Sequence, residues 1–408
     1  MRSKILFSIT PVLYCFVQIR EDYLLKLLTL ISIVIYRPDR FFRPLRGRKR
    51  SGFLPYRKLG IYLPAAERAR RESLPRKTLC LNRRMKYGIN FVFFGYYDCE
   101  DEGMGNGNMG IFVGLWIAGL LWCLSNLILC PRKLSYKRQF DREAGSKKFD
   151  KEAYQKADKY SFQLKSDFGY ILSCELIKPD PSKENGKYKK IAVLCHGLGC
   201  AKCSGYKYAE LFLRLGYHVL LYDQRNHGQS GRALTSMGFY ERLDLKKVID
   251  WCFCTYGKEI RIVTHGESMG AATVLMHLGI DDRVTCTIAD CAYSDLITLV
   301  KHQVKQYYHL PSFLIPVISF VTYLRAGFWY HDISPIKVVG KTETPILFIH
   351  GKIDNFVPTA MSKYMYACKR KDKAIYLVAR AKHAQSIVVN RKGYEKRVTD
   401  FVSRYLEL

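Results

Sequence analysis

The sequence lacks the patterns that usually connect a strong positive charge with nucleic acid. Its 408 residues contain 66 Lys and Arg but only 36 Asp and Glu, for a formal net charge of +30. It has no zinc-finger spacing, no RNA-binding aromatic signature and no heptad repeat. A basic surface is attracted to anionic lipid, or it reflects a basic proteome. We therefore expect no nucleic-acid partner.

Cysteine pairs that frame short loops are also missing, although the chain has 14 cysteines. Residues such as Cys195, Cys252 and Cys286 lie in apolar stretches. This is typical of buried free thiols in a reducing compartment, not of a secreted disulfide scaffold. Cys200-Ala-Lys-Cys203 is a single C-x-x-C pair, and a zinc site of four cysteines needs a second pair nearby. We predict no metal and no cofactor.

One long apolar run is present. Gly110 to Cys130 has no charged residue and is about twenty residues long, enough to span a bilayer as a helix. Acidic residues at 98–102 precede it, whereas Arg132 and Lys133 follow it. The run has little polar face for a core helix, and no basic segment directly before it for a signal peptide. We predict a single transmembrane helix over 109–131, in the cell membrane, with the C-terminal part of the chain in the cytoplasm.

Residues 1–108 are basic and show no sustained periodicity. The apolar stretch from Tyr23 to Tyr36 is short and interrupted by Lys26, which favours an interfacial helix over a span. Met104 and Met109 stand immediately before the clean apolar run. We expect residues 1–108 to be a poorly ordered extension, or residues 1 to about 103 to be an upstream region that is not a genuine part of the protein.

A folded domain is predicted over 161–408, after a polar linker with a short helix over 132–160. A hairpin starts the domain, and apolar strands then alternate with helical stretches. The predicted strands are 191–195, 218–222, 260–264, 285–289, 345–349 and 374–378; the predicted helices include 206–214, 239–252 and 269–278. Nearly continuous apolar strands alternating with helices indicate an α/β fold with a doubly wound, mostly parallel sheet.

The pentapeptide Gly266-Glu267-Ser268-Met269-Gly270 is the main functional signal. It follows the predicted strand 260–264 and precedes a helix of small residues. The G-x-S-x-G pattern at such a junction is the nucleophile elbow, a sharp turn that exposes the serine hydroxyl. The glycines are needed because side chains there would collide with neighbouring backbone. Alone, the serine also suits an ordinary helix N-cap.

Three further sequence blocks also follow predicted strands. They are His196-Gly197-Leu198-Gly199, the segment from Asp223 to Ser230, and His350-Gly351-Lys352-Ile353-Asp354 with a later His383. With these four blocks the chain resembles the α/β-hydrolase superfamily, in particular its serine aminopeptidase and monoacylglycerol-lipase branch, from about Ser161 to the C-terminus. The order Ser, Asp, His is the one this fold uses.

The resemblance implies a catalytic triad of Ser268, Asp354 and His383. His383 would take the serine proton, and Asp354 would orient and stabilise the imidazole. The backbone N–H groups of Leu198 and Met269 would form the oxyanion hole. Asp290 is an alternative acid because it too follows a strand. The histidines His196, His227, His265 and His350 are expected to shape loops through hydrogen bonds to backbone.

Residues from about 296 to 335 interrupt the strand–helix alternation. They are apolar and contain several prolines and aromatics, and the resemblance implies a small helical cap over the active site. An apolar cap suits an acyl chain, but it equally suits simple packing on the sheet. The polar residues Lys301, His302, Lys305 and Tyr307 suit anionic headgroups or a solvated helix face.

We expect a membrane-anchored serine hydrolase that cleaves carboxylic esters through an acyl-enzyme. Its partners would be an acyl ester or another apolar small molecule, and membrane lipid through the predicted helix and its basic flanks. Two alternatives stay open: a serine peptidase or aminopeptidase of the same fold, and a hydrolase-like module that binds without catalysis.

Overall fold

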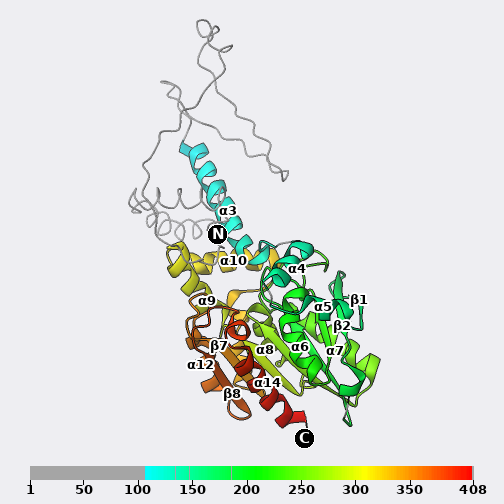
Figure 1. Ribbon diagram of the computed structural model, residues 1–408. Helices are drawn as coiled ribbons and strands as arrows, with labels where there is room; N and C mark the ends of the chain where they lie inside the picture. The colour runs from blue at the N-terminus through cyan, green and yellow to red at the C-terminus, as the bar shows by residue number, and fades with distance from the viewer. Residues whose placement is uncertain (1–105, 134, 147, 185, 407–408) are drawn as a thin grey trace, which may run out of the picture. The chain divides into compact units, whose positions relative to one another are not determined.

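The computed structural model describes residues 106–133, 135–146, 148–184 and 186–406 (Figure 1). Side chains are described from residue 114 onward. Contacts place the described residues from Ile117 onward in one structural unit. The extension predicted over 1–108 lies almost entirely outside the described residues.

Eight strands form one sheet in the order β1-β2-β4-β3-β5-β6-β7-β8. The β1/β2 and β2/β4 pairs are antiparallel, and the five other pairs are parallel. The strands are Lys159–Lys165 (β1), Ile171–Ile177 (β2), Lys189–Cys195 (β3), His218–Tyr222 (β4), Ile260–Glu267 (β5), Cys286–Asp290 (β6), Ile346–Gly351 (β7) and Lys373–Val378 (β8). The predicted α/β fold with a mostly parallel sheet is confirmed.

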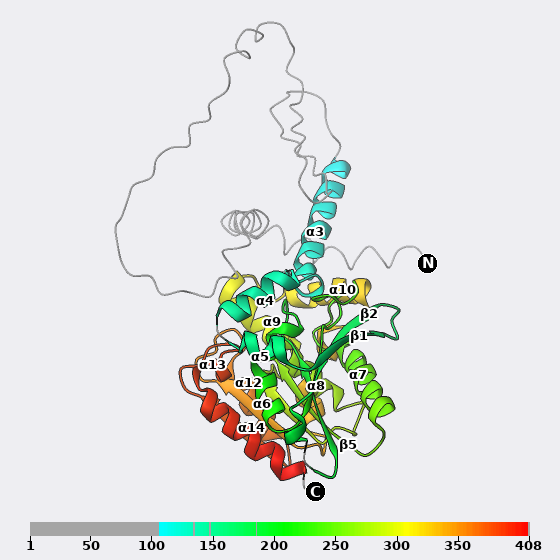
Figure 2. The same ribbon diagram turned by 45° about the vertical axis from the view of Figure 1, so that its right-hand side comes forward.

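The strands are apolar on both faces because helices cover both sides of the sheet. In β3, Ile191 and Val193 point into one core, whereas Ala192 and Leu194 point into the other. The first core includes helices α7 (Glu241–Tyr256), α8 (Met269–His277) and α12 (Thr359–Cys368); the second includes α6 (Tyr206–Arg214), α13 (Ser386–Val389) and α14 (Arg391–Leu406). Figure 2 shows α7 and α14 on opposite sides of the sheet.

Two helices occupy the segment in which a polar linker was predicted. They are α4 (Tyr136–Gly145) and α5 (Lys151–Lys156). Phe149, between them, is buried, and its ring centroid lies 5.3 Å from that of Tyr206 on α6. Tyr154 stacks on the same ring at 4.2 Å, and both tyrosine hydroxyls donate to the buried carboxylate of Glu175. The segment therefore contributes to the core beside β2 and α6.

Helix α3 (Asn106–Leu129) occupies most of the long apolar run. Within the described part of the chain, no helix is both long enough and apolar enough to cross a membrane. The transmembrane helix predicted over 109–131 is thus not supported. The end of α3 instead packs against the rest of the fold, because Leu129 is fully buried and the Arg325 guanidinium donates to the Trp122 carbonyl and the Asn126 amide oxygen.

A set of short helices lies between β6 and β7, where the sequence predicted a helical cap. They are α9 (Leu296–Gln303), the π-helical turn η6 (Val304–Tyr308), α10 (Leu314–Ala326), η7 (Tyr330–Asp332) and α11 (Pro335–Val339). Ile315 and Ile318 of α10 belong to a core cluster that also includes Met269, Tyr293 and Leu129. This cluster joins the end of α3, the cap helices and the start of α8.

We expect Phe149→Ala to lower the free energy of unfolding by about 3 kcal/mol, because it opens a cavity among buried rings. Phe313→Ala is the matched control, since Phe313 is 59% exposed, and its effect should stay within about 0.5 kcal/mol. Chemical denaturation of the two variants and the parent measures both values. Equal stability of the two variants would show that residues 136–156 are only a linker.

Candidate active site

Ser268 lies in a strained turn between β5 and α8. Its φ is +56° and its ψ is −114°, a conformation that L residues rarely adopt. Its backbone N–H donates to the Asp290 carbonyl at 2.8 Å, and its carbonyl accepts from the N–H of Ala272. The turn thus directs the Ser268 side chain away from the sheet, as the G-x-S-x-G pattern predicts.

The two glycines of the turn are needed for steric reasons. A Cβ at Gly266 would lie 2.2 Å from the Gly270 carbonyl oxygen, and a Cβ at Gly270 would lie 2.1 Å from the Cys195 carbonyl oxygen. Both distances are far below van der Waals contact. The second collision also shows that the end of β3 lies directly against the start of α8.

A chain of two hydrogen bonds joins Ser268, His383 and Asp354. His383 follows β8, and its Nε2 lies 2.9 Å from Ser268 Oγ. Its Nδ1 lies 2.7 Å from Asp354 Oδ2. The His383 side chain is 20% exposed, whereas that of Asp354 is completely buried. The structure therefore brings together the three residues that the sequence predicted as a triad.

Asp354 is held as a carboxylate by its surroundings. Burial alone would raise its pKa, but hydrogen bonds to His350 and His383 outweigh that effect and keep the pKa below its usual 3.8. The other oxygen, Oδ1, accepts from the backbone N–H groups of Phe356 and Val357, both at 2.9 Å. The carboxylate is therefore available at neutral pH to orient the imidazole of His383.

Asp290, the alternative acid, points elsewhere. Its Oδ1 accepts a hydrogen bond from Ser386 at 3.1 Å, and its Oδ2 lies 3.4 Å from the Tyr208 hydroxyl. Burial and repulsion from Glu267 raise the pKa of Asp290 to about 6. The hydrogen-bonding partner of His383 is Asp354, as the sequence favoured.

Glu267, the residue before Ser268, forms a buried ion pair with Lys207. Lys207 Nζ and the Tyr208 hydroxyl each lie 2.5 Å from Glu267 Oε2. Burial alone would raise the pKa of Glu267, but the Lys207 charge outweighs it and keeps the pKa low. No local sequence pattern predicts this pair, because Lys207 lies 60 residues before Glu267 in the chain.

The remaining histidines near the site are buried. His196 Nε2 accepts from the Gln224 N–H, and His227 Nε2 accepts from the Gly199 N–H, so both shape loops through backbone as expected. His265 instead contacts the Tyr394 hydroxyl at 2.7 Å. Burial lowers the pKa of His196 to about 4 and that of His265 to about 3. These rings are therefore neutral around pH 7.

His350 bonds to backbone as expected, because its Nε2 lies 3.0 Å from the Val357 carbonyl oxygen. The same nitrogen also lies 3.2 Å from Asp354 Oδ2, and its Nδ1 lies 2.7 Å from the Ser362 hydroxyl. His350 therefore helps to hold the Asp354 carboxylate. The i, i+4 spacing of the two residues after a strand was the available signal.

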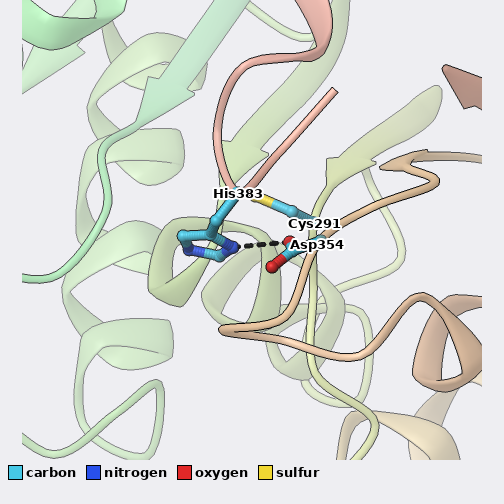
Figure 3. Close-up of side chains that lie close together, drawn as sticks. All are labelled: Cys291, Asp354 and His383. Carbon is cyan, nitrogen blue, oxygen red and sulfur yellow. Dashed lines mark hydrogen bonds and ion pairs between the residues drawn. The ribbon is translucent and has the colours of Figure 1, made fainter. Parts of the chain in front are cut away.

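Cys291 lies beside Asp354 and His383 (Figure 3). One potential ligand atom from each of the three residues lies within 4.8 Å of the other two. Among the described residues, this group is the candidate for holding a metal ion. Burial and the nearby carboxylates raise the pKa of the Cys291 thiol well above its usual value, which disfavours the thiolate that a metal requires. Asp354 and His383 already bond to each other. We interpret the group as an acid–base pair with a neutral thiol packed against it.

The loop after β3 lies next to the serine. A Cβ at Gly197 would lie 3.5 Å from the Ser268 Cβ, so the segment His196-Gly197-Leu198 passes directly by the turn. Met269, the first residue of α8, is fully buried in the apolar cluster that joins α8 and the cap, and Leu198 packs against that cluster. The two backbone N–H groups predicted for an oxyanion hole therefore belong to segments that flank Ser268.

Comparison with known proteins agrees with this architecture. Residues 192–315 match the family model described as the alpha/beta hydrolase fold. The chain is 34% identical over 281 residues to the uncharacterized protein YqkD of Bacillus subtilis (strain 168), covering 68% of this chain and 90% of that protein. The chain belongs to the α/β-hydrolase superfamily.

More distant matches cover less of the chain or are less similar. The uncharacterized protein YfhR of Escherichia coli (strain K12) is 24% identical over 193 residues, which are 46% of this chain and 60% of that protein. Esterase Pf2001 of Pyrococcus furiosus aligns with a TM-score of 0.49 and 24% identity, over 61% of this chain and 94% of that chain. The acylaminoacyl peptidase of Pyrococcus horikoshii aligns with a TM-score of 0.46 and 18% identity, over 62% and 43% of the two chains.

For this α/β-hydrolase, replacing Asp354 and Asp290 one at a time by asparagine distinguishes their roles. We expect Asp354→Asn to lower kcat by about 10⁴-fold, because the imidazole loses the partner that orients it and stabilises its charge. Asp290→Asn, which leaves the His383 hydrogen bond in place, should cost less than about tenfold. Steady-state kinetics of the two variants test this, and a larger loss for Asp290→Asn would reverse the assignment.

Asp290 should also make the stability of the hydrolase depend on pH. A folded-state pKa of about 6, above the ordinary 3.8, means that the folded protein binds this proton more tightly. The stabilisation is complete below pH 3.8 and is lost as pH rises through about 6. We expect Asp290→Asn to gain about 2 kcal/mol relative to the parent between pH 4.5 and 7.5. Urea unfolding at both pH values measures this, and a pH-independent difference would contradict it.

Proposed function

We propose that this α/β-hydrolase is a serine hydrolase that cleaves carboxylic esters through an acyl-enzyme. The observation that carries the proposal is the hydrogen-bond chain from Ser268 Oγ through His383 to the buried Asp354 carboxylate. A neutral serine is a weak nucleophile, and an adjacent base oriented by a carboxylate is the arrangement that activates it.

In the proposed reaction, Ser268 Oγ attacks the carbonyl carbon while its proton passes to His383 Nε2. The imidazolium is stabilised by Asp354, which stays ionised. The developing oxyanion is bound by the backbone N–H groups of Met269 and Leu198. Collapse of the tetrahedral intermediate returns the proton from His383 to the leaving alcohol. A water molecule, deprotonated by the same ring, then releases the carboxylic acid and restores Ser268.

The apolar layer around the site supports a substrate with an apolar acyl portion. Met269 and Leu198 flank Ser268 and belong to one cluster with Leu299, Ile315 and Ile318 of the cap. Apolar residues beside a few oriented polar groups are usual at small-molecule sites, and these buried side chains also pack the cap on the sheet.

The carboxylates near Ser268 already have hydrogen-bond or ion-pair partners, and this favours an ester substrate over a peptide with a free N-terminus. A peptide amine would require an acidic side chain as its partner. Among the described residues next to Ser268, Asp354 is bonded to His383, Glu267 to Lys207 and Asp290 to Ser386. A peptidase stays the second candidate, because acyl transfer itself does not depend on whether oxygen or nitrogen leaves. Attachment to a membrane and a cytoplasmic location stay predictions from the sequence.

The nucleophile is tested with a fluorophosphonate probe and by kinetics. We expect the probe to label the parent protein, and Ser268→Ala to abolish labelling and lower kcat by about 10⁶-fold. Ser312→Ala, which removes an exposed serine of the cap, is the control and should label like the parent. Equal labelling of Ser268→Ala would reject the assigned nucleophile. Absence of labelling in the parent would favour a non-catalytic binding module.

Substrate class is tested on p-nitrophenyl esters of two to twelve acyl carbons and on aminoacyl p-nitroanilides. We expect a higher kcat/KM for the esters, rising with chain length because apolar residues of the cap cluster with the residues that flank Ser268. Faster cleavage of the anilides would replace the esterase with the peptidase.

A further inference from the structure

Helix α10 is apolar on both of its long sides. Ile315 and Ile318 face inward and are buried. The apolar side chains that face outward, from the residue before the helix onward, are Phe313 (59% exposed), Val317 (40%), Phe320 (47%), Tyr323 (42%) and Leu324 (67%). A helix that is apolar all round normally lies in a core or against a membrane. We call these five residues the α10 face.

Aromatic side chains extend the α10 face at its edges. The Trp329 ring stacks on Tyr323 at 4.7 Å and lies 5.9 Å from Phe320. Trp122 of α3 is 53% exposed, and the Arg325 guanidinium covers its ring at 3.8 Å. A contiguous exposed apolar surface of this kind marks an interaction site. Trp and Tyr at its border are typical of the bilayer interface, where an apolar ring body and a polar edge are both satisfied.

The charge around the α10 face is mostly positive; the acid nearest in sequence is Asp332, whose carboxylate accepts from the Trp329 N–H and lies 3.4 Å from His331 Nε2. Residues 296–331 contain no Asp or Glu, but they contain Lys301, Lys305 and Arg325. Residues 106–140, which include the Trp122 helix, also contain no Asp or Glu. An apolar face with basic flanks complements an anionic lipid surface. A second copy of the same face would bring like charges together, so the charge pattern disfavours self-association.

The α10 face and the proposed active site lie on opposite sides of the same helix. The inward residues Ile315 and Ile318 share an apolar cluster with Met269, which directly follows Ser268. Helix α10 thus separates the outer surface from the apolar layer around the serine.

We infer that the α10 face binds the surface of an anionic lipid bilayer. Phe313, Phe320 and Leu324 enter the boundary between headgroups and acyl chains, while Lys301 and Lys305 meet the phosphates; Arg325 stays engaged with Trp122 and Asn126 of α3. The helix lies in the plane of the interface and does not span the bilayer.

Vesicle flotation of the full chain tests this inference. One set of vesicles is phosphatidylcholine alone. The other contains about 30 mol% phosphatidylglycerol, which gives the surface a negative charge. We expect binding to the anionic vesicles, and loss of at least about tenfold in binding for Phe320→Glu/Leu324→Glu. The control Tyr364→Glu/Val389→Glu changes two apolar residues of 62% and 43% exposure on other helices and should bind like the parent.

A second measurement covers the case in which another segment also holds the protein on vesicles. In Trp116→Phe/Trp122→Phe, the remaining tryptophans are Trp329 at the α10 face and Trp251, which stacks on Phe162 at 4.2 Å away from the cap. We expect nitroxide-labelled lipid to quench about half of this fluorescence, since Trp329 enters the interface and Trp251 does not. Binding without quenching would overturn the inference.

Two other results would also overturn it. One is failure of the parent protein to float with anionic vesicles. The other is a dimer of the parent, detected by light scattering, that Phe320→Glu/Leu324→Glu dissociates. Ser268→Ala should bind vesicles like the parent, because its side chain is not part of the α10 face. The inference of lipid binding and the proposal of ester hydrolysis can therefore be rejected independently of each other.

Discussion

The close approach of the end of β3 to the start of α8 is the constraint on which the site depends. It places the Cys195 carbonyl where a side chain on residue 270 would otherwise lie. This contact holds the loop through Leu198 beside Ser268. It also requires the sharp turn in which Ser268 adopts a positive φ. The turn is stable because the sheet and the helices on both of its faces determine its geometry.

The charged groups around the serine illustrate how burial controls their chemistry. Asp354 stays ionised because two histidines and two backbone N–H groups bond to it. Glu267 stays ionised because Lys207 is buried beside it. Asp290 has no cation of its own, and its pKa is raised to about 6. Three carboxyl groups near the serine thus differ in the direction in which burial and neighbours shift the pKa: it is lowered for Asp354 and Glu267 and raised to about 6 for Asp290. Asp354, whose pKa is lowered, is the one that bonds to His383.

Much of the fold was predictable because its strands are short apolar runs with clear turn signals. Strand β4 and helix α6 begin and end at the predicted residues, and the parallel sheet followed from the alternation of strands and helices. The ordered blocks around Gly197, Ser268, Asp354 and His383 predicted which residues meet, because carboxyl ends of parallel strands share one edge. Helices α4 and α5 were harder to predict, since their segment is polar and its core contacts depend on single rings such as Phe149 and Tyr154.

The sequence by itself determined the α/β architecture, the strained serine turn and the candidate Ser268, Asp354 and His383. These follow from local patterns, namely glycine spacing, apolar strands and the residues at strand ends. Only the tertiary structure decided that Asp354, not Asp290, bonds to His383, that Lys207 neutralises Glu267, and that the end of α3 packs against the cap. It also decided which side of α10 faces outward. These outcomes depend on contacts between residues far apart in the chain, whose geometry no local pattern encodes.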